Sequence, residues 1–153
     1  MKKNTKNGGA RSTARLFAVK ALYQLMMSDE PQASLVIDEY KQHRLGQVIE
    51  DIEFMAADED MFADIVSGAW NRQDEIAETL ASCLKAGWAI DRLEKLIHAI
   101  LLAGSYELIA RPDVPTAVII TEYVDVTHAF CERQEASFVN GVLDKFGKIV
   151  RAA

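Results

Sequence analysis

The sequence predicts an all-α protein, a compact single domain of about six or seven helices. Apolar residues recur at spacings of three and four in successive segments, and no stretch alternates apolar and polar residues for long. The best strand candidate, Val118–Ile120, is flanked by residues that keep the helical spacing. Prolines occur only at positions 31, 112 and 115, near predicted helix boundaries. A chain of 153 residues is long enough for one domain with a substantial core.

Two helices and a loop are predicted in the first third of the chain. The first helix runs from a cap at Ser12 or Thr13 to about Met27. Its apolar stripe contains Leu16, Val19, Tyr23, Met26 and Met27. A shorter helix covers about 32–42, and the weak periodicity of 43–57 indicates a loop with a turn.

Two more helices are predicted in the middle of the chain. The acidic run Asp58–Asp60 is a helix-start signal, because carboxylates favour the positive end of the helix dipole. Helical spacing of apolar residues continues from there to Trp70. A further helix covers 74–84, and Gly87 ends that pattern.

The last third predicts three helices, of which the first is the strongest. Residues 91–110 are apolar around most of the helix circumference, which is typical of a helix in the middle of a bundle. Arg111-Pro112-Asp113 ends it. Pro115 suits the first turn of the next helix, which runs to about Phe130. A final helix covers roughly 135–150.

Charge is divided unevenly along the chain. Residues 1–28 hold six basic residues and no acidic one, whereas residues 29–153 hold 11 basic and 23 acidic residues, a net charge of −12. Residues 1–10 are polar and contain a glycine pair, so we expect a disordered basic arm ahead of a helical domain over 11–153. This polarity favours a protein with two binding faces, one for polyanions. A solvated arm that only aids solubility is an equally good interpretation of the charge alone.

Several classes of protein are disfavoured. The longest uncharged apolar stretch, 96–106, is too short to cross a bilayer, and the first residues lack the pattern of a secretory signal. We therefore expect a cytoplasmic protein. Cys83 and Cys131 are isolated, so we expect neither a disulfide nor a metal site.

Enzyme signatures are missing, so we expect no catalytic activity and no cofactor. The segment 141–149 superficially resembles a phosphate-binding loop, but five residues separate its glycines and it continues a helical pattern. His43, His98 and His128 are far apart in sequence, and His98 has the apolar neighbours of a partly buried core residue. No nucleophile, base and orienting group come together in the sequence.

The N-terminal segment is the better candidate for binding. Arg11 and Arg15 lie four residues apart on one helix face, and we expect both to be exposed and able to bind phosphate oxygens. Tyr23 lies eight residues after Arg15, at the edge of the same surface. Cations beside an aromatic ring suit single-stranded nucleic acid, because bases stack on rings. Tyr23 also falls on the apolar stripe, so a core position stays open.

A second candidate surface lies on the helix that begins near Pro115. Thr121, Glu122, Asp125 and His128 share one face of that helix. This polar, acidic strip could contact a basic protein. An ordinary solvent-exposed face explains the same pattern, and the strip alone favours that interpretation.

Three sequence segments together resemble a known family. They are the stretch from Arg11 to Gln24 ending in ALYQ, the stretch from Tyr106 to Pro115 containing YEL and DVP, and FVNGVLDK at 138–145. Their order and spacing are similar to those of the NusB family of bacterial transcription antitermination factors, over nearly the whole chain. The resemblance implies two helical subdomains. It also implies that, with the small-subunit ribosomal protein NusE, the protein binds boxA RNA of ribosomal RNA leaders and supports read-through by RNA polymerase.

The resemblance also implies site residues. RNA contacts fall on Arg11, Arg15, Tyr23, Phe130 and Phe138, with added attraction from Lys2, Lys3 and Lys6. The NusE surface includes Glu107, Glu122 and Asp125. Phe138 begins an apolar stripe, so both a core role and an RNA role stay open for it. The chain departs from the family at Ser12 and Thr13, where arginines are common, and at Leu102 and Ser137, which predicts weaker RNA binding by the isolated protein.

Two questions stay open from the sequence. A helical protein–protein scaffold with no RNA binding is the alternative function. Whether the free protein forms a homodimer is not decided either. The same helical module also begins some ribosomal-RNA cytosine methyltransferases, but those chains are far longer and this one carries no methyltransferase region.

Overall fold

The computed structural model describes residues 9–43, 57–85, 90 and 93–151. Within this part of the chain all the regular structure is helical, which confirms the predicted all-α class. The seven helices are α1 (Ala10–Met26), α2 (Ala33–His43), α3 (Glu59–Asn71), α4 (Gln73–Cys83), α5 (Lys95–Ala110), α6 (Thr116–Phe130) and α7 (Arg133–Val150). The predicted loop over 43–57 falls mostly outside the described residues.

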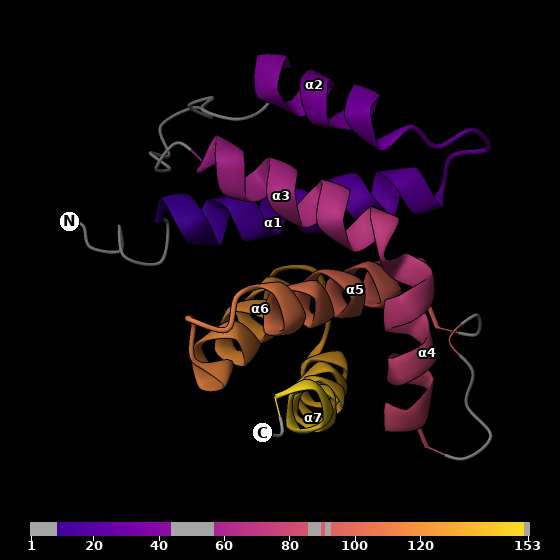
Figure 1. Ribbon diagram of the computed structural model, residues 1–153, viewed down its shortest axis with the longest axis vertical. Helices are drawn as coiled ribbons and strands as arrows, with labels where there is room; N and C mark the ends of the chain where they lie inside the picture. The colour runs from indigo at the N-terminus through magenta and orange to yellow at the C-terminus, as the bar shows by residue number, and fades with distance from the viewer. Residues whose placement is uncertain (1–8, 44–56, 86–89, 91–92, 152–153) are drawn as a thin grey trace.

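The helices form two groups that share one core. Figure 1 shows α1, α2 and α3 together in one group, and α5, α6 and α7 in a second group below it, with α4 standing beside the ends of both. The interface between the groups includes α1 packing on α5 and α6, and α3 packing on α5. Buried residues from all seven helices belong to a single continuous hydrophobic cluster, so the two groups form one folding unit.

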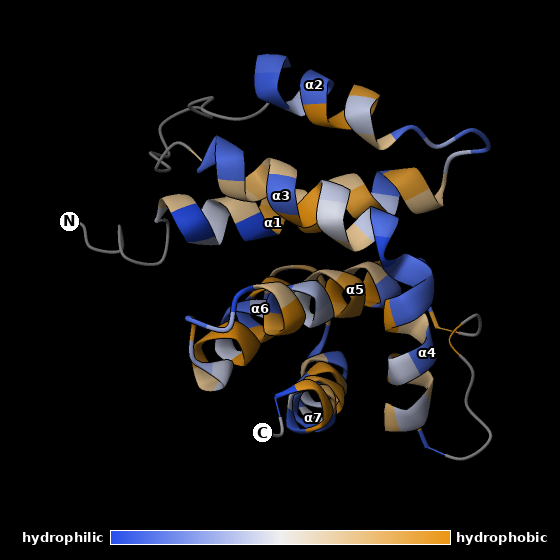
Figure 2. Ribbon diagram, viewed as in Figure 1, coloured by the Kyte–Doolittle hydropathy of each residue, from blue (hydrophilic) through white to orange (hydrophobic). Residues whose placement is uncertain are grey.

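Helix α5 lies at the centre of the bundle, as its sequence predicts. It contacts α1, α3, α4, α6 and α7. Figure 2 shows it coloured as hydrophobic along most of its length, while the outer helix α2 carries many hydrophilic residues. Gly104 allows this close packing, because a Cβ there would lie only 3.0 Å from a methyl group of Leu143 on α7. A helix buried on every side needs apolar residues on every side.

A second glycine brings α3 against α5. A Cβ on Gly68 would overlap the ring of Tyr106, so this aromatic side chain lies directly on the α3 backbone. The Tyr106 hydroxyl donates a hydrogen bond to the Asp64 carboxylate at 2.7 Å, and Arg111 pairs with the same carboxylate at 2.9 Å. Burial and the hydrogen bond to Asp64 raise the pKa of Tyr106 to about 12. The contact joins the two groups of helices on one side of the bundle.

The helix starts confirm one predicted cap and correct another. The Asp58 carboxylate accepts a hydrogen bond from the Met61 backbone N–H at 3.0 Å, so the acidic start of α3 is confirmed. Helix α1 begins earlier than predicted, at Ala10, with Gly9 at the N-cap position. The cap predicted at Ser12 or Thr13 is therefore wrong. The Ser12 hydroxyl instead donates to Glu122 on α6, a partner that the local sequence does not reveal.

The corner between α5 and α6 is held by a residue at the end of α7. The Arg151 guanidinium donates hydrogen bonds to the backbone carbonyls of Leu108, Arg111 and Val114, at 2.9, 2.7 and 2.7 Å. Carbonyls at the end of a helix lack partners within the helix, and a cation interacts favourably with the negative end of the helix dipole. Arg151 therefore fixes the connection that contains the DVP sequence.

Candidate nucleic-acid interface

Five polar residues form a partly buried cluster between α1, α5 and α6, which we call the Arg15 cluster. Its members are Ser12, Arg15, Glu107, Glu122 and Tyr123. Arg15 donates to both oxygens of Glu107, from Nε at 2.7 Å and from Nη2 at 3.1 Å. Its third nitrogen, Nη1, lies 3.2 Å from Oε1 of Glu122. One guanidinium from α1 thus connects α5 and α6.

The remaining bonds complete the cluster. The Tyr123 hydroxyl donates to Glu107 Oε2 at 2.5 Å, and the Ser12 hydroxyl donates to Glu122 Oε1 at 2.7 Å. Burial opposes the charge of Arg15, but the hydrogen bond and charge of Glu107 outweigh it, so the pKa of Arg15 is raised. Burial and the neighbouring Glu107 also raise the pKa of Tyr123, which keeps that hydroxyl protonated as a donor. Every charged member therefore has a hydrogen-bonded partner, as buried charges require.

The cluster corrects two predictions about exposure. Arg15 is only 4% exposed, so the expectation of an exposed phosphate-binding side chain is wrong. Glu107 is 0% exposed, and both of its carboxylate oxygens are bonded within the fold. It has no surface with which to meet a partner protein. The sequence places Arg15 and Glu107 92 residues apart, so no local pattern could reveal the pair.

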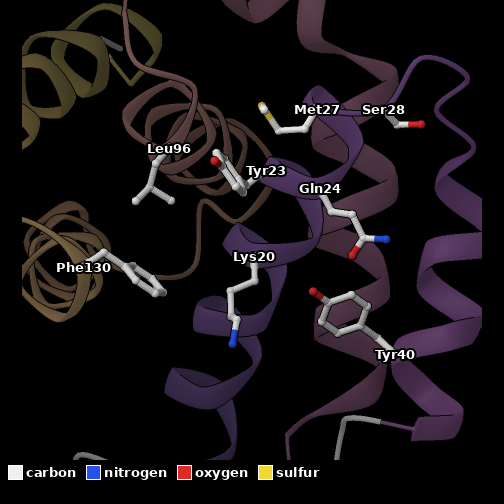
Figure 3. Close-up of a pocket in the computed structure, with 8 residues that line it drawn as sticks. All are labelled: Lys20, Tyr23, Gln24, Met27, Ser28, Tyr40, Leu96 and Phe130. Atoms are coloured by element: carbon white, nitrogen blue, oxygen red, sulfur yellow. The ribbon is translucent and has the colours of Figure 1, made fainter.

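An open groove of about 790 Å³ lies at the other end of α1, and we call it the aromatic groove. Its walls come from α1, from the start of α5 and from the end of α6, with a further contribution from α2. The lining residues are Lys20, Tyr23, Gln24, Met27, Ser28, Tyr40, Leu96 and Phe130. Figure 3 shows Phe130 projecting from its helix toward α1, on the side of α1 where Tyr23 and Leu96 lie.

Two aromatic rings in this groove are open to solvent. Tyr23 is 39% exposed and Phe130 is 40% exposed, although both are large hydrophobic side chains. The sequence left a core position open for Tyr23, and the structure places this side chain at the surface instead. The structure thus brings together two of the predicted RNA contacts, which are 107 positions apart in the chain. Two exposed rings that line one groove offer π-faces for stacking.

Lys20 is a groove residue that sequence reasoning did not assign to the site. It is exposed, and its ammonium lies 5.5 Å from the centre of the Phe17 ring. It precedes Tyr23 by three residues and Met27 by seven, so all three share one helix face. That spacing is the signal that could have identified it. Its charge places a cation at the edge of the apolar groove.

The other predicted residues lie apart from the groove. Arg11 is exposed in the first turn of α1, about 18 Å along the helix from Tyr23. Phe138 on α7 is half-buried against the core and does not belong to the described groove lining. Asp125 is exposed on α6, while the Glu122 side chain is 25% exposed and bonded to the Arg15 cluster. Lys2, Lys3 and Lys6 lie outside the described residues.

The described residues meet the requirements of neither a metal site nor a membrane span. Among them, no three His, Cys, Asp or Glu side chains are grouped so as to bind a metal ion. Both cysteines are free, and Cys83 is buried. No described helix is long and apolar enough to span a bilayer.

Comparison with known proteins places these features in a family. A family model described as the NusB family matches residues 12–148. A protein of Novosphingobium aromaticivorans, named transcription antitermination protein NusB, is 52% identical over 145 residues, which cover 95% of this chain and 97% of the relative. A protein of the same name from Sphingopyxis alaskensis is 51% identical over 146 residues, covering 95% and 97%.

Solved structures share the fold. The T. maritima NusB structure aligns with a TM-score of 0.73 at 23% identity, covering 92% of each chain. A structure described as antitermination factors NusB and NusE in complex with dsRNA aligns with a TM-score of 0.72 at 22% identity, covering 97% of this chain and 99% of that one. The arrangement of helices is thus common to sequences that have diverged widely.

Proposed function

Because the chain belongs to the NusB family, we propose that it is a transcription antitermination factor that binds single-stranded boxA RNA through the aromatic groove. Together with NusE it would join the RNA polymerase antitermination complex and support read-through of terminators. It acts by binding, without catalysis, in the cytoplasm. The curated relatives carry the name of this activity, and one structure with the same fold is described as NusB and NusE in complex with dsRNA.

The observation that carries the RNA-binding proposal is the pair of exposed rings beside a lysine. Leaving two large aromatic side chains about 40% exposed forgoes hydrophobic stabilisation, which indicates a surface used for binding. Bases stack on such rings, with a contribution of about 1–3 kcal/mol for each base. Lys20, and Arg11 further along α1, supply positive charge for the phosphates.

The surface for NusE is proposed on the α5–α6 side of the molecule. Asp125 is exposed there, and Glu122 is partly exposed one turn earlier on α6. Both carry negative charge, which suits a basic ribosomal protein. Glu107, which the sequence also placed in this surface, is buried and would act only through the fold.

Titration of boxA RNA with single variants tests the groove. Tyr23→Ala and Phe130→Ala should each weaken RNA binding by about 5- to 150-fold, since each removes one stacking ring. Leu35→Ala is the matched control, because Leu35 is a 58% exposed apolar residue on α2, outside the groove. Thermal unfolding of each variant separates lost binding from lost folding. Equal affinities for all three variants would refute the groove as the RNA site.

The salt dependence separates the proposal from the scaffold alternative. If about four to six phosphates are contacted, the slope of log K against log salt should be near −3 to −4. A flat dependence would favour a helical scaffold without RNA binding. A titration of RNA with and without NusE then tests the proposed NusE surface. An RNA affinity that NusE leaves unchanged would contradict cooperation between that surface and the aromatic groove.

A further inference from the structure

The Arg15 cluster and the aromatic groove lie on the same three helices. Helices α1, α5 and α6 carry the cluster through Arg15, Glu107 and Glu122, of which Glu122 lies near the middle of α6. The same helices carry Tyr23, Leu96 and Phe130 at the groove. The geometry of the Arg15 cluster and the geometry of the aromatic groove therefore both depend on how α6 packs against α1.

The seam between α1 and α6 runs from the cluster to the groove. Ser12 on α1 contacts Glu122 on α6, and further along in the same chain direction Tyr23 and Phe130 line the groove together. Phe130 is eight residues after Glu122, about 12 Å along the helix. Both residues lie on one continuous helix, so we expect a displacement of α6 at Glu122 to be transmitted to Phe130.

We propose that Glu122 is a positioning residue for RNA binding, which holds α6 against α1 so that Phe130 stays opposite Tyr23. This inference rests on the proposed function of the groove. The Glu122 oxygen that accepts from Ser12 at 2.7 Å also lies 3.2 Å from the Arg15 guanidinium. Its side chain is only 25% exposed, so this atom is committed to the fold. Stacking depends on the spacing, because a gap of 0.5–1 Å forfeits a quarter to a half of the contact energy.

The sign of the effect distinguishes positioning from simple electrostatics. Removing a carboxylate near a polyanion should strengthen RNA binding if Glu122 acts only through its charge. Positioning predicts the opposite, a loss of about two- to thirtyfold for Glu122→Ala. The salt slope should stay unchanged, because no phosphate contact is removed. Glu132→Gln is the charge-matched control, since Glu132 is exposed two residues after Phe130 and should leave RNA affinity unchanged or raised.

Two further variants keep the test independent of folding and of the partner surface. Glu122→Gln retains an oxygen that can accept from Ser12, so its loss of RNA affinity should be smaller. Ser12→Ala removes the Ser12–Glu122 hydrogen bond by a change on α1, so the acidic surface of α6 keeps its charge. This variant should also weaken RNA binding. Chemical denaturation shows which variants remain folded under the binding conditions.

A double-mutant cycle gives the decisive result. If Glu122 acts by placing Phe130, the penalty of Glu122→Ala should disappear in a Phe130→Ala background. An undiminished penalty in that background would overturn the inference, as would RNA binding by Glu122→Ala at or above the wild-type level. If Phe130→Ala and Tyr23→Ala alone leave RNA affinity unchanged, the groove proposal itself fails. The two failures are therefore distinguishable.

Discussion

Replacing Arg15 with alanine should destabilise the fold strongly. The change removes a guanidinium that is 4% exposed and that donates to both oxygens of Glu107. Glu107 is 0% exposed and would keep only the hydrogen bond from Tyr123. A buried carboxylate without its cation must stay charged in an apolar site or take up a proton, and either outcome costs free energy.

We expect the loss to be about 3–5 kcal/mol, the usual cost of breaking a buried ion pair by removing one partner. Small proteins have total stabilities of about 5–15 kcal/mol, so this loss is a large fraction. For a chain of this length each kcal/mol shifts the melting temperature by about 2–4 °C, which gives a decrease of roughly 6–20 °C. Arg11→Ala is the matched control, because Arg11 is exposed one turn earlier in α1 and should change stability by less than about 0.5 kcal/mol.

Urea unfolding followed by circular dichroism measures both variants. The triple variant Arg15→Met, Glu107→Leu, Tyr123→Phe then removes the three buried polar groups of the Arg15 cluster. Its stability should recover most of the loss, because apolar replacement of a whole buried pair is often neutral or stabilising. A cost below about 1 kcal/mol for Arg15→Ala would show that the guanidinium is solvated and would refute the assignment of the cluster to the interior.

Other parts of the fold give further expectations. Gly68→Ala should cost about 1–3 kcal/mol, since its Cβ overlaps the Tyr106 ring, whereas Gly141→Ala, with open space around it, should stabilise α7 by up to about 1 kcal/mol in the same urea assay. Arg151→Ala removes three carbonyl hydrogen bonds and should lower stability by about 2 kcal/mol; an unchanged melting temperature would contradict this. Burial lowers the pKa of His98, so its contribution is complete above about pH 6.5 and is lost as the pH falls through the lowered folded-state pKa. Urea midpoints at pH 7 and pH 5 should therefore differ more in the wild type than in His98→Gln.

Local patterns in the sequence anticipated most of the helices. Helical spacing requires only neighbouring residues, so α3 and its cap at Asp58 could be predicted from a short stretch. Residues 95–110 are apolar around most of the helix circumference, which predicted the central position of α5. The start of α1 was missed because its N-cap, Gly9, makes no side-chain hydrogen bond and Ser12 has a distant partner.

The candidate site was less predictable from the sequence than the helices were. Aromatic residues near ALYQ and at the end of α6 were identifiable as candidates, and Tyr23 and Phe130 do line one groove. Sequence could not show that Arg15 and Glu107 are buried together, because a basic residue on a helix is exposed in most proteins. A charged pair becomes a core element only when packing brings both members to the same place.

Residue order alone was sufficient for the all-α class, the central helix and the family, since these depend on periodicity and on short motifs. The packing of α1 on α5 and α6 was needed to separate the charges that face solvent from those that join helices. The physical reason is the range of the interactions. Helical periodicity depends on residues that are close in sequence, whereas burial and ion pairing depend on residues that come into contact only after the chain has folded.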